Sequence, residues 1–333
     1  MKEASTFSAS LKKVKKMKID FNEAVALLKA KDKILILTHA NPDGDTIGSG
    51  FALLRALRQL GKRAKLRNSD IIPSKYNYLF EDLEDDDFEE EFIVSVDVAE
   101  KKLLGDKLLT LYGERVNLSL DHHSTSRLFA EKTYCESESA SACEVVYLVI
   151  KALGAKITKE IANCIFTGMS TDTGCFKYSS VTERTHLLAA ELISFGAEHF
   201  KINERMFDTK TQGSLALYKM CLENLDYFAD GKIASICVTK DMLEKSGTTK
   251  SDLDAIKPLT RQIEGVKIGL TVKEEENGKI GVSVRTDEDV DASAICANFG
   301  GGGHVRAAGC EFRDVSVKEA QQTVVDYILK SIL

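Results

Sequence analysis

Long apolar runs, disorder-promoting tracts and paired cysteines are all missing from this sequence. No uninterrupted apolar stretch comes near the roughly 20 residues that a membrane-spanning helix needs, and the N-terminus lacks the apolar core of a secretion signal. No Pro-rich or Gly/Ser-rich tract is long enough to indicate disorder, and the eight cysteines include no Cys-x-x-Cys pair. We therefore expect a compact cytoplasmic protein with reduced thiols and no membrane partner.

A strongly basic surface is missing as well. The formal net charge of −6 argues against a protein that holds long duplex DNA, although a local basic groove is not excluded. No aromatic pair stands out as a base-stacking platform, so the sequence indicates no base preference. An anionic substrate would have to be bound by metals and a few cationic side chains at the site itself.

The first part of the chain has the pattern of an α/β domain. Short apolar runs at 34–37, 92–96 and 116–120 are each separated from the next by a helix-length segment or a polar loop. This alternation predicts a doubly wound, mainly parallel sheet with helices on both faces. Residues 52–60 fit the first crossover helix, closed by Gly61.

The pattern changes near residue 211, because a long helix is followed by strands near 233–238, 266–273 and 279–285. Asn277-Gly278 between the last two strands is a strong signal for a tight hairpin. A final helix should pack on this sheet, which makes the second domain α+β with a mixed sheet. We expect three parts in all: a catalytic domain over 1–195, a helical linker over 196–215 and a smaller substrate-binding domain over 216–333.

Each of the first three apolar runs is followed by residues that can bind metals. These are His39, Asp43 and Asp45 after the first run, Asp97 after the second, and Asp121, His122 and His123 after the third. A single Asp after a strand is usually a turn residue or a helix cap. Ligands bind at the carboxyl ends of the strands in open α/β sheets, so these three loops should converge. Three such strand ends in one domain make coincidence a poor explanation.

Asp172 is the fourth contributor, at the end of an apolar helix. A carboxylate at a helix C-terminus opposes the macrodipole, which a cation would compensate. With Asp43, Asp45 and Asp97 it brings a charge of −4, which two divalent cations balance. Mixed carboxylate and imidazole ligands suit Mn²⁺ best, with Mg²⁺, Co²⁺ or Zn²⁺ as alternatives. Two such ions would share Asp97 and activate a bridging water.

Four consecutive glycines, residues 300–303, are the strongest signal in the second domain. They are costly to order, and they make sense where the backbone closes on a ligand. The substrate-binding candidates of this domain are Gly301, Gly302, Gly303, His304 and Arg285. An Arg can grip a phosphate with two hydrogen bonds, although a surface salt bridge is the simpler role for Arg285. Gly48-Ser-Gly50 is a weaker candidate for binding an anion.

The order of these motifs resembles a known family. With His39-x-x-Pro-Asp43-Gly-Asp45, Asp97, Asp121-His122-His123, Asp172 and the glycine run, the sequence resembles the DHH superfamily of phosphoesterases. Within it, the sequence looks most like the branch with the DHH-associated C-terminal domain, and its length resembles nanoRNases and pAp phosphatases of the NrnA type. The match spans both domains, although Ser126 stands where many relatives carry Asn.

The resemblance implies an activity and a role for each site residue. It implies hydrolysis of very short oligoribonucleotides and of 3′-phosphoadenosine 5′-phosphate (pAp). One metal would be held by His39 and Asp43, the other by Asp45, His122 and Asp172, with Asp97 as the bridge. Asp121 would support the site, His123 would face the substrate phosphate, and Arg285 and His304 would bring phosphate-binding groups from the second domain.

Other functions compete with this one. Cyclic dinucleotides such as c-di-AMP, or their linear products, are the alternative substrates. A family II pyrophosphatase shares the first-domain ligands but has a different C-terminal domain, and RecJ-type DNA exonucleases are usually longer. A catalytically inactive nucleotide-binding regulator is a more distant alternative, since every expected ligand is present. The expected partner is short single-stranded RNA or a nucleotide, and the oligomeric state stays open, with a homodimer as one option.

Overall fold

The computed structural model describes residues 16–248, 256, 259–275, 278–287 and 289–332, and the chain divides into two compact units. Unit 1 ends at Thr209 and unit 2 begins at Lys210. The segment 196–215, expected to be a separate linker, is divided between them. Its first half belongs to unit 1 because Ala197 and Ile202 are buried in that unit's core.

Unit 1 is built on a sheet of six parallel strands in the order β1-β6-β5-β4-β2-β3. The strands are β1 (Met17–Lys18), β2 (Ile34–Leu37), β3 (Ala64–Arg67), β4 (Phe92–Val96), β5 (Leu118–Asp121) and β6 (Lys132–Cys135). Every residue of β2 and β4 is buried, which explains why all of them except Ser95 are apolar. The predicted α/β fold with a parallel sheet is confirmed.

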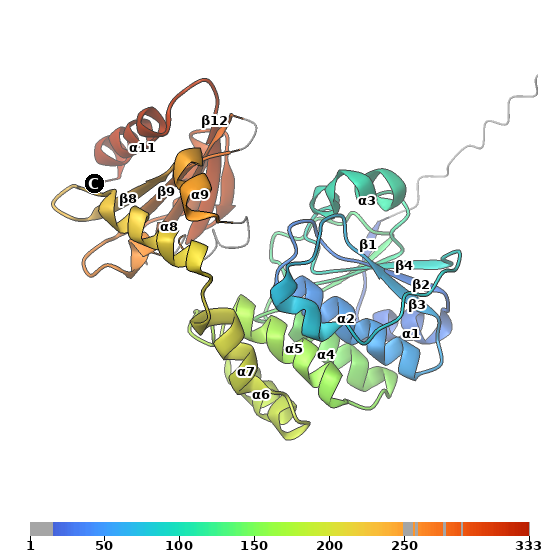
Figure 1. Ribbon diagram of the computed structural model, residues 1–333. Helices are drawn as coiled ribbons and strands as arrows, with labels where there is room; N and C mark the ends of the chain where they lie inside the picture. Colours follow the sequence, from blue (N-terminus) through green and yellow to red (C-terminus); the bar gives the residue numbers. More distant parts are fainter. Residues whose placement is uncertain (1–15, 249–255, 257–258, 276–277, 288, 333) are drawn as a thin grey trace, which may run out of the picture. The chain divides into compact units, whose positions relative to one another are not determined.

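Helices cover both faces of this sheet. In Figure 1, α3 lies on one face and α1, α2, α4 and α5 lie on the other. The helices of unit 1 are α1 (Phe21–Ala30), α2 (Gly44–Gln59), α3 (Gly105–Tyr112), α4 (Ala142–Leu153), α5 (Lys159–Asp172), α6 (Glu183–Ser194) and α7 (His199–Asn203), with short turns η1 (Ser74–Leu79), η2 (Lys101–Leu104) and η3 (Glu204–Asp208).

The helix predicted at 52–60 begins eight residues earlier than expected. Its first turns contain Gly44, Gly48 and Gly50, which have low helix propensity and therefore hid the start. Asp43 caps the helix, since its side chain accepts hydrogen bonds from the backbone N–H groups of Asp45 and Thr46. The N-terminus of α2 therefore lies at the carboxyl edge of the sheet, among the predicted metal ligands.

Unit 2 has a six-stranded mixed sheet in the order β11-β12-β10-β9-β8-β7, in which only β8 and β9 are parallel. Its strands are β7 (Leu225–Phe228), β8 (Ile233–Val238), β9 (Ile268–Glu274), β10 (Ile280–Thr286), β11 (Gly302–His304) and β12 (Ala307–Phe312). The predicted hairpin between β9 and β10 is present, and Gly278 has the positive φ of a tight turn. Asn277 lies outside the described residues.

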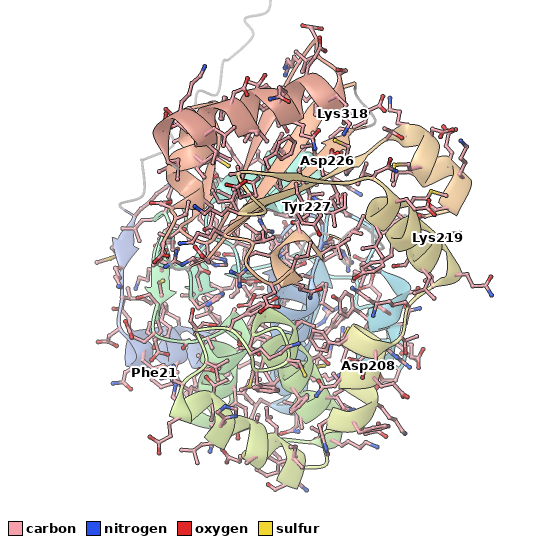
Figure 2. All side chains as sticks on the ribbon, turned by 90° about the vertical axis from the view of Figure 1, so that its left-hand side faces the viewer. Phe21, Asp208, Lys219, Asp226, Tyr227 and Lys318 are labelled. Carbon is pink, nitrogen blue, oxygen red and sulfur yellow. The ribbon has the colours of Figure 1, made fainter. Side chains whose placement is uncertain are left out.

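The helices of unit 2 pack on its sheet and form two buried apolar clusters with it. They are α8 (Gln212–Glu223), α9 (Lys240–Ser246), α10 (Ala292–Ala297) and α11 (Val317–Ser331), with the short turn η5 (Leu259–Gln262). The Lys318 ammonium of α11 lies 2.6 Å from the Asp226 carboxylate of β7, a contact at the top of Figure 2. Over the described part of both units, no helix combines the length and apolarity needed to cross a membrane.

Candidate metal centre

Close helix packing brings the N-terminus of α2 against the C-terminal half of α5. A Cβ atom on Gly44 would lie 2.3 Å from Thr171 Oγ1, and one on Gly48 would lie 2.4 Å from the carbonyl oxygen of Cys164. Only glycine permits this approach. The interpretation of Gly48-Ser-Gly50 as an anion site is therefore wrong, because these residues are buried between helices. Their packing places Asp45 of α2 beside Asp172 of α5.

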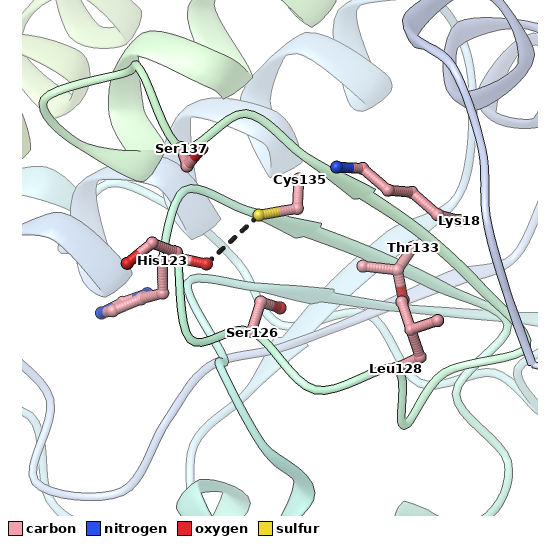
Figure 3. A pocket seen from close by; sticks show the side chains of 8 residues that line it. Lys18, His123, Ser126, Leu128, Thr133, Cys135 and Ser137 are labelled. Carbon is pink, nitrogen blue, oxygen red and sulfur yellow. Dashed lines mark hydrogen bonds between the residues drawn. The ribbon is translucent and has the colours of Figure 1, made fainter.

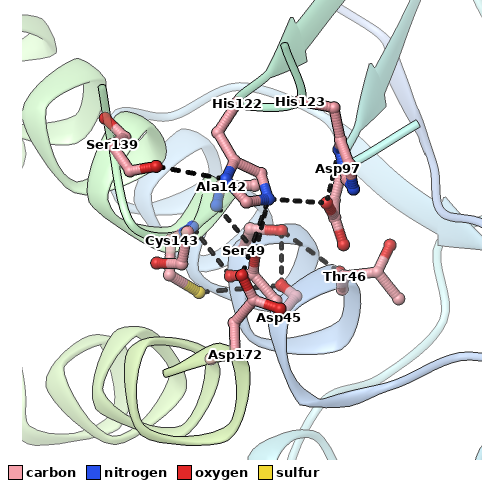
Figure 4. A network of polar contacts seen from close by, with 12 residues as sticks. Asp45, Thr46, Ser49, Asp97, His122, His123, Ser139, Ala142, Cys143 and Asp172 are labelled. Atoms are coloured by element: carbon pink, nitrogen blue, oxygen red, sulfur yellow. Dashed lines mark hydrogen bonds and ion pairs between the residues drawn. The ribbon is translucent and has the colours of Figure 1, made fainter. Parts of the chain in front are cut away.

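Carboxylates and imidazoles from the three predicted strand ends and from α5 meet in three overlapping groups that could hold metal ions. The first group is His39, Asp43 and Asp97, the second is Asp45, His122 and Asp172, and the third is Asp97, His122 and His123. The ligand atoms within each group all lie within 4.8 Å of one another. Figure 4 shows the second group together with Asp97. All six residues that the sequence proposed as metal ligands thus lie in one centre.

Asp97 lies between the first and second groups. Its Oδ2 is 3.4 Å from His39 Nε2, and its Oδ1 is 3.7 Å from His122 Nε2. These separations exceed hydrogen-bond lengths, and they are shorter than two metal–ligand bonds of about 2.1 Å each. Asp97 is 3% exposed, and its Oδ1 has no hydrogen-bond partner among the described residues. The backbone at Asp97 has a φ of 57°, a strained conformation that turns the carboxylate into the centre.

The two central histidines present the same nitrogen to the carboxylates. His39 Nδ1 lies 2.8 Å from the carbonyl oxygen of Ala40, and His122 Nδ1 lies 3.2 Å from that of Ser139. A carbonyl can only accept, so Nδ1 carries the proton in both rings. Nε2 then faces the carboxylates, and in the neutral ring it is the nitrogen whose lone pair a metal would bind.

Asp45 is held by the start of another helix. Its Oδ2 accepts a hydrogen bond from the N–H of Ala142 at 2.6 Å, and its Oδ1 accepts one from the N–H of Cys143 at 2.9 Å. These two N–H groups open α4 and have no partner within the helix, and the helix dipole favours a negative charge there. Asp45 is therefore fixed as a carboxylate that faces Asp172 and His122 (Figure 4).

The crowding of carboxylates is visible in their proton affinities. Burial and repulsion from Asp45 raise the pKa of Asp97 well above its usual value. Burial and repulsion from Asp43 raise the pKa of Asp45 to about 6, against the hydrogen bonds from α4. Burial and Asp45 likewise raise the pKa of Asp172 to about 7. Burial disfavours the imidazolium of His39, but the carboxylates of Asp43 and Asp97 raise its pKa to about 11.

These observations fit divalent cations. The centre concentrates more negative charge than its imidazoles neutralise, it contains a buried carboxylate oxygen without a donor, and both histidines offer Nε2. The groups of possible ligands overlap, since Asp97 belongs to two of them, and such a centre suits divalent cations. The donors, carboxylate oxygen and imidazole nitrogen, are those of Mn²⁺, Mg²⁺, Co²⁺ and Zn²⁺ sites.

His123 lies at the rim of the centre and is fixed by Asp121. The fully buried Asp121 carboxylate accepts hydrogen bonds from the N–H of His122 at 2.9 Å and from His123 Nδ1 at 2.8 Å. Burial lowers the pKa of an imidazole, but the carboxylates of Asp121 and Asp97 raise that of His123 to about 9. A hollow of about 110 Å³ adjoins His123, lined by Lys18, Cys135 and several hydroxyl groups (Figure 3).

The candidates in unit 2 lie on β10 and on or beside β11, the two strands that flank β12 in its sheet. Arg285 is half-buried on β10, opposite Ala307 of β12, and its guanidinium donates to the carbonyl oxygen of Val284 at 3.1 Å. Gly302 and Gly303 form β11, which ends at His304, whose side chain lies outside the described residues. These residues belong to unit 2, whereas the metal centre belongs to unit 1.

The glycine run has structural reasons that the sequence did not reveal. A Cβ atom on Gly301 would lie 2.2 Å from the carbonyl oxygen of Gly309, and Gly300 and Gly303 have φ values of 73° and 147°. Three of the four glycines are therefore required by the chain itself. Gly302 differs, because a Cβ atom there would meet nothing within 4 Å.

Several residues that support the centre were missed from the sequence. Asn68 Nδ2 donates to the carbonyl oxygen of His39 at 2.7 Å, and Thr46 Oγ1 accepts from the N–H of His39 at 3.3 Å. No local pattern marks either role. The helix start that donates hydrogen bonds to Asp45 could be recognised in the sequence. Ser141-x-x-Glu144 is typical of a helix start, and Ser141 caps α4.

The fold and the centre define a two-domain α/β protein with a carboxylate and imidazole site suited to divalent cations. Comparison with known families places it further. Residues 33–169 match the DHH family, N-terminal domain, and residues 231–331 match the DHHA1 domain. The chain therefore belongs to the DHH family and carries the DHHA1 domain.

Relatives resemble the chain over nearly its full length. A bifunctional oligoribonuclease and PAP phosphatase NrnA from Thermus thermophilus is 29% identical over 93% of this chain and 93% of its own. The protein of the same name from Bacillus subtilis is 25% identical over 91% of this chain and 96% of its own. The crystal structure of an exopolyphosphatase-related protein from Bacteroides fragilis is 26% identical, covers 93% of this chain and 97% of its own, and superposes with a TM-score of 0.83.

Proposed function

We propose that this protein is a two-metal phosphoesterase that hydrolyses very short oligoribonucleotides and the 3′-phosphate of pAp. The observation that carries the proposal is Asp97, whose two oxygens face two separate groups of ligands at 3.4 and 3.7 Å. A centre of this kind suits hydrolysis at phosphorus, where a nucleophile and a leaving oxygen both need stabilisation. The relatives named as oligoribonucleases and PAP phosphatases support the substrate class, since they match more than nine-tenths of the chain.

Each residue of the centre has a role in this proposal. His39 and Asp43 would hold one cation, Asp45, His122 and Asp172 would hold the other, and Asp97 would be available to both. The ions, for which we propose Mn²⁺, would supply an activated water and charge stabilisation at the phosphoryl group. His123 donates a hydrogen bond to a phosphate oxygen through Nε2. Its Nδ1 is engaged by Asp121, which holds the ring in that orientation.

Unit 2 contributes phosphate binding in this proposal. Arg285 offers a planar guanidinium, and Gly302 offers backbone beside open space, since a Cβ atom there would meet nothing within 4 Å. Gly301 and Gly303 hold β11 against β12 and so set the position of Gly302, while His304 supplies a further donor. The support for these roles is motif position together with the open space at Gly302.

A substrate panel tests the proposal. We expect turnover of RNA dinucleotides to pentanucleotides and of pAp, with Mn²⁺ more effective than Mg²⁺, Co²⁺ or Zn²⁺, and much slower turnover of c-di-AMP. An Asp97→Asn protein purified in parallel controls for contaminating nucleases. Turnover of c-di-AMP alone would replace the proposed substrate, and absence of turnover with every substrate and metal would overturn the proposed activity.

A further inference from the structure

A second hollow of unit 1 opens beside the metal centre at the carboxyl end of β3. It has a volume of about 410 Å³, within the range of roughly 300–1,000 Å³ that is common for ligand sites. Most of its apolar wall comes from Phe51 of α2, Leu66 of β3, and Ile71, Ile72 and Phe80 on and beside η1. We call this hollow the β3 groove.

Two stacked rings form part of the apolar surface of the β3 groove. The ring centroids of Phe51 and Phe80 are 4.7 Å apart and the planes differ by 15°. Ile71, which also lines the groove, has a side chain that is 93% exposed, the highest value among the large apolar residues described. Apolar surface next to a groove favours a planar, apolar occupant over bulk water.

The charged groups of the groove are already engaged. The Arg67 guanidinium pairs with the Asp85 carboxylate at 2.8 Å, and the Asp70 carboxylate accepts from the N–H of Asn41 at 2.7 Å. The side chain of Asn77 is exposed on the groove, and no hydrogen bond joins its amide to the described residues. A free amide offers both a donor and an acceptor, which suits the edge of a nucleobase better than a phosphate.

Hydrogen bonds connect the groove directly to the metal centre. Asn68 lines the groove, and its Nδ2 donates to the carbonyl oxygen of His39 and to Thr38 Oγ1, at 2.7 Å in each case. Asp70 holds Asn41, two residues beyond His39 in the same loop. The groove and the first ligand group therefore belong to one hydrogen-bonded wall.

We infer that the β3 groove binds a nucleobase of the substrate while the attached phosphate lies at the metal centre. The inference rests on the proposed function, which it extends by assigning a base-binding site to unit 1. The base lies against the apolar surface of Ile71 and the Phe51–Phe80 pair, and Asn77 contacts its polar edge. Base recognition by apolar contact alone is tolerant of sequence, so Asn77 is the residue that would impose a preference.

Kinetics with and without a base test the inference. The substrates are pAp and ribose 3′,5′-bisphosphate, which differ only in the adenine. The variants are Ile71→Asp, which places a charge on the groove, and Asn77→Ala. Leu187→Asp is the matched control, because Leu187 is 62% exposed on α6 and does not line the groove.

We expect Ile71→Asp to raise KM for pAp roughly tenfold, as expected for loss of one base contact, and to leave kcat and the base-free substrate unchanged. Asn77→Ala should raise KM for pAp severalfold, and Leu187→Asp should behave as the wild type. Equal effects on both substrates, or no effect on either, would overturn the inference.

A binding measurement separates this inference from the proposed function. The probe is 2-aminopurine riboside 5′-monophosphate, whose fluorescence falls when the ring is stacked. Quenching by the wild type that Ile71→Asp removes would support the groove even if no phosphate ester were hydrolysed. Turnover of pAp without quenching would refute the groove and leave the proposed activity standing, and quenching that survives Ile71→Asp would place the base elsewhere.

Discussion

The metal centre of unit 1 and the glycine run of unit 2, both proposed here to bind phosphate, are built in opposite ways. The centre gathers Asp43, Asp45, Asp97 and Asp172 with two imidazoles, and most of these side chains are buried or half-buried. The glycine run has no side chains, and Gly302 faces open space. The carboxylates of the centre repel one another, and bound cations would relieve this repulsion. The glycine run offers only backbone groups.

This difference indicates that the chemical step should be sought at the metal centre and substrate binding at the glycine run. Charges that are buried together are costly unless a ligand compensates them, so the centre is where a change should alter turnover. Glycines held by strand pairing keep their conformation without a ligand. Changes there should alter substrate affinity or stability, and four experiments separate these outcomes.

Removing the shared carboxylate should have the largest effect. We expect Asp97→Asn to lower kcat/KM for an RNA dinucleotide on the order of a thousandfold or more, because both cations lose a ligand. It should also abolish the rise in melting temperature that Mn²⁺ causes in the wild type, measured by differential scanning fluorimetry. Asp208→Asn, at an exposed position of η3, is the control. Near-normal turnover of Asp97→Asn would disprove a shared carboxylate.

Metal removal should make stability depend on pH. Asp45 and Asp172 bind protons at pKa values of about 6 and about 7 in the fold, above the usual aspartate pKa of 3.8. The metal-free fold then binds more protons than the unfolded chain, so this contribution to stability is present below about pH 4 and is lost as pH rises through 6 and 7. In EDTA we expect the melting temperature to fall by several degrees between pH 5.5 and 8.

The stabilisation by Mn²⁺ should consequently be larger at pH 8 than at pH 5.5, since the cations replace those protons. Asp172→Asn should reduce the pH dependence of the melting temperature in EDTA, because it removes one of the carboxyl groups whose pKa is raised. A Mn²⁺-induced shift that is the same at both pH values would contradict the electrostatic account of the centre.

Two neighbouring glycines can separate structure from binding in unit 2. Gly301→Ala should lower the free energy of unfolding by about 1–3 kcal/mol, because its Cβ would overlap the carbonyl oxygen of Gly309. Gly302→Ala should leave stability unchanged and raise KM for pAp severalfold. Urea unfolding and steady-state kinetics measure both. If Gly302→Ala changes neither quantity, the glycine run serves the fold alone.

Arg285→Lys should have the smallest effect on turnover. An ammonium keeps the charge but cannot make two parallel hydrogen bonds to a phosphate. We therefore expect KM to rise about tenfold or less and kcat to stay within about twofold. Arg313→Lys, at an exposed position of the same unit, serves as the control. A selective loss of kcat would instead assign Arg285 to the chemical step.

Local signals were enough to predict three of the six strands of unit 1 and the candidate ligands at their ends. The runs at 34–37 and 92–96 are strands with those bounds, because a fully buried parallel strand is mostly apolar, with Ser95 as the one polar residue of these two. The ligands were predictable for the same reason, since carboxyl ends of parallel strands lie at one edge. The start of α2 was not predictable. Gly44 and Gly48 are there because they pack against α5, and the sequence pattern of one helix does not show which helix packs against it.

By itself, the sequence determined the class of fold, the six candidate ligands and the resemblance to DHH proteins, since all of these depend on residue types and their order. Tertiary structure alone decided which ligands face each oxygen of Asp97, that the start of α4 holds Asp45 across 97 positions of chain, and that Phe51 stacks on Phe80. These are contacts between distant segments. Their geometry depends on how helices and sheet pack, which local periodicity does not specify.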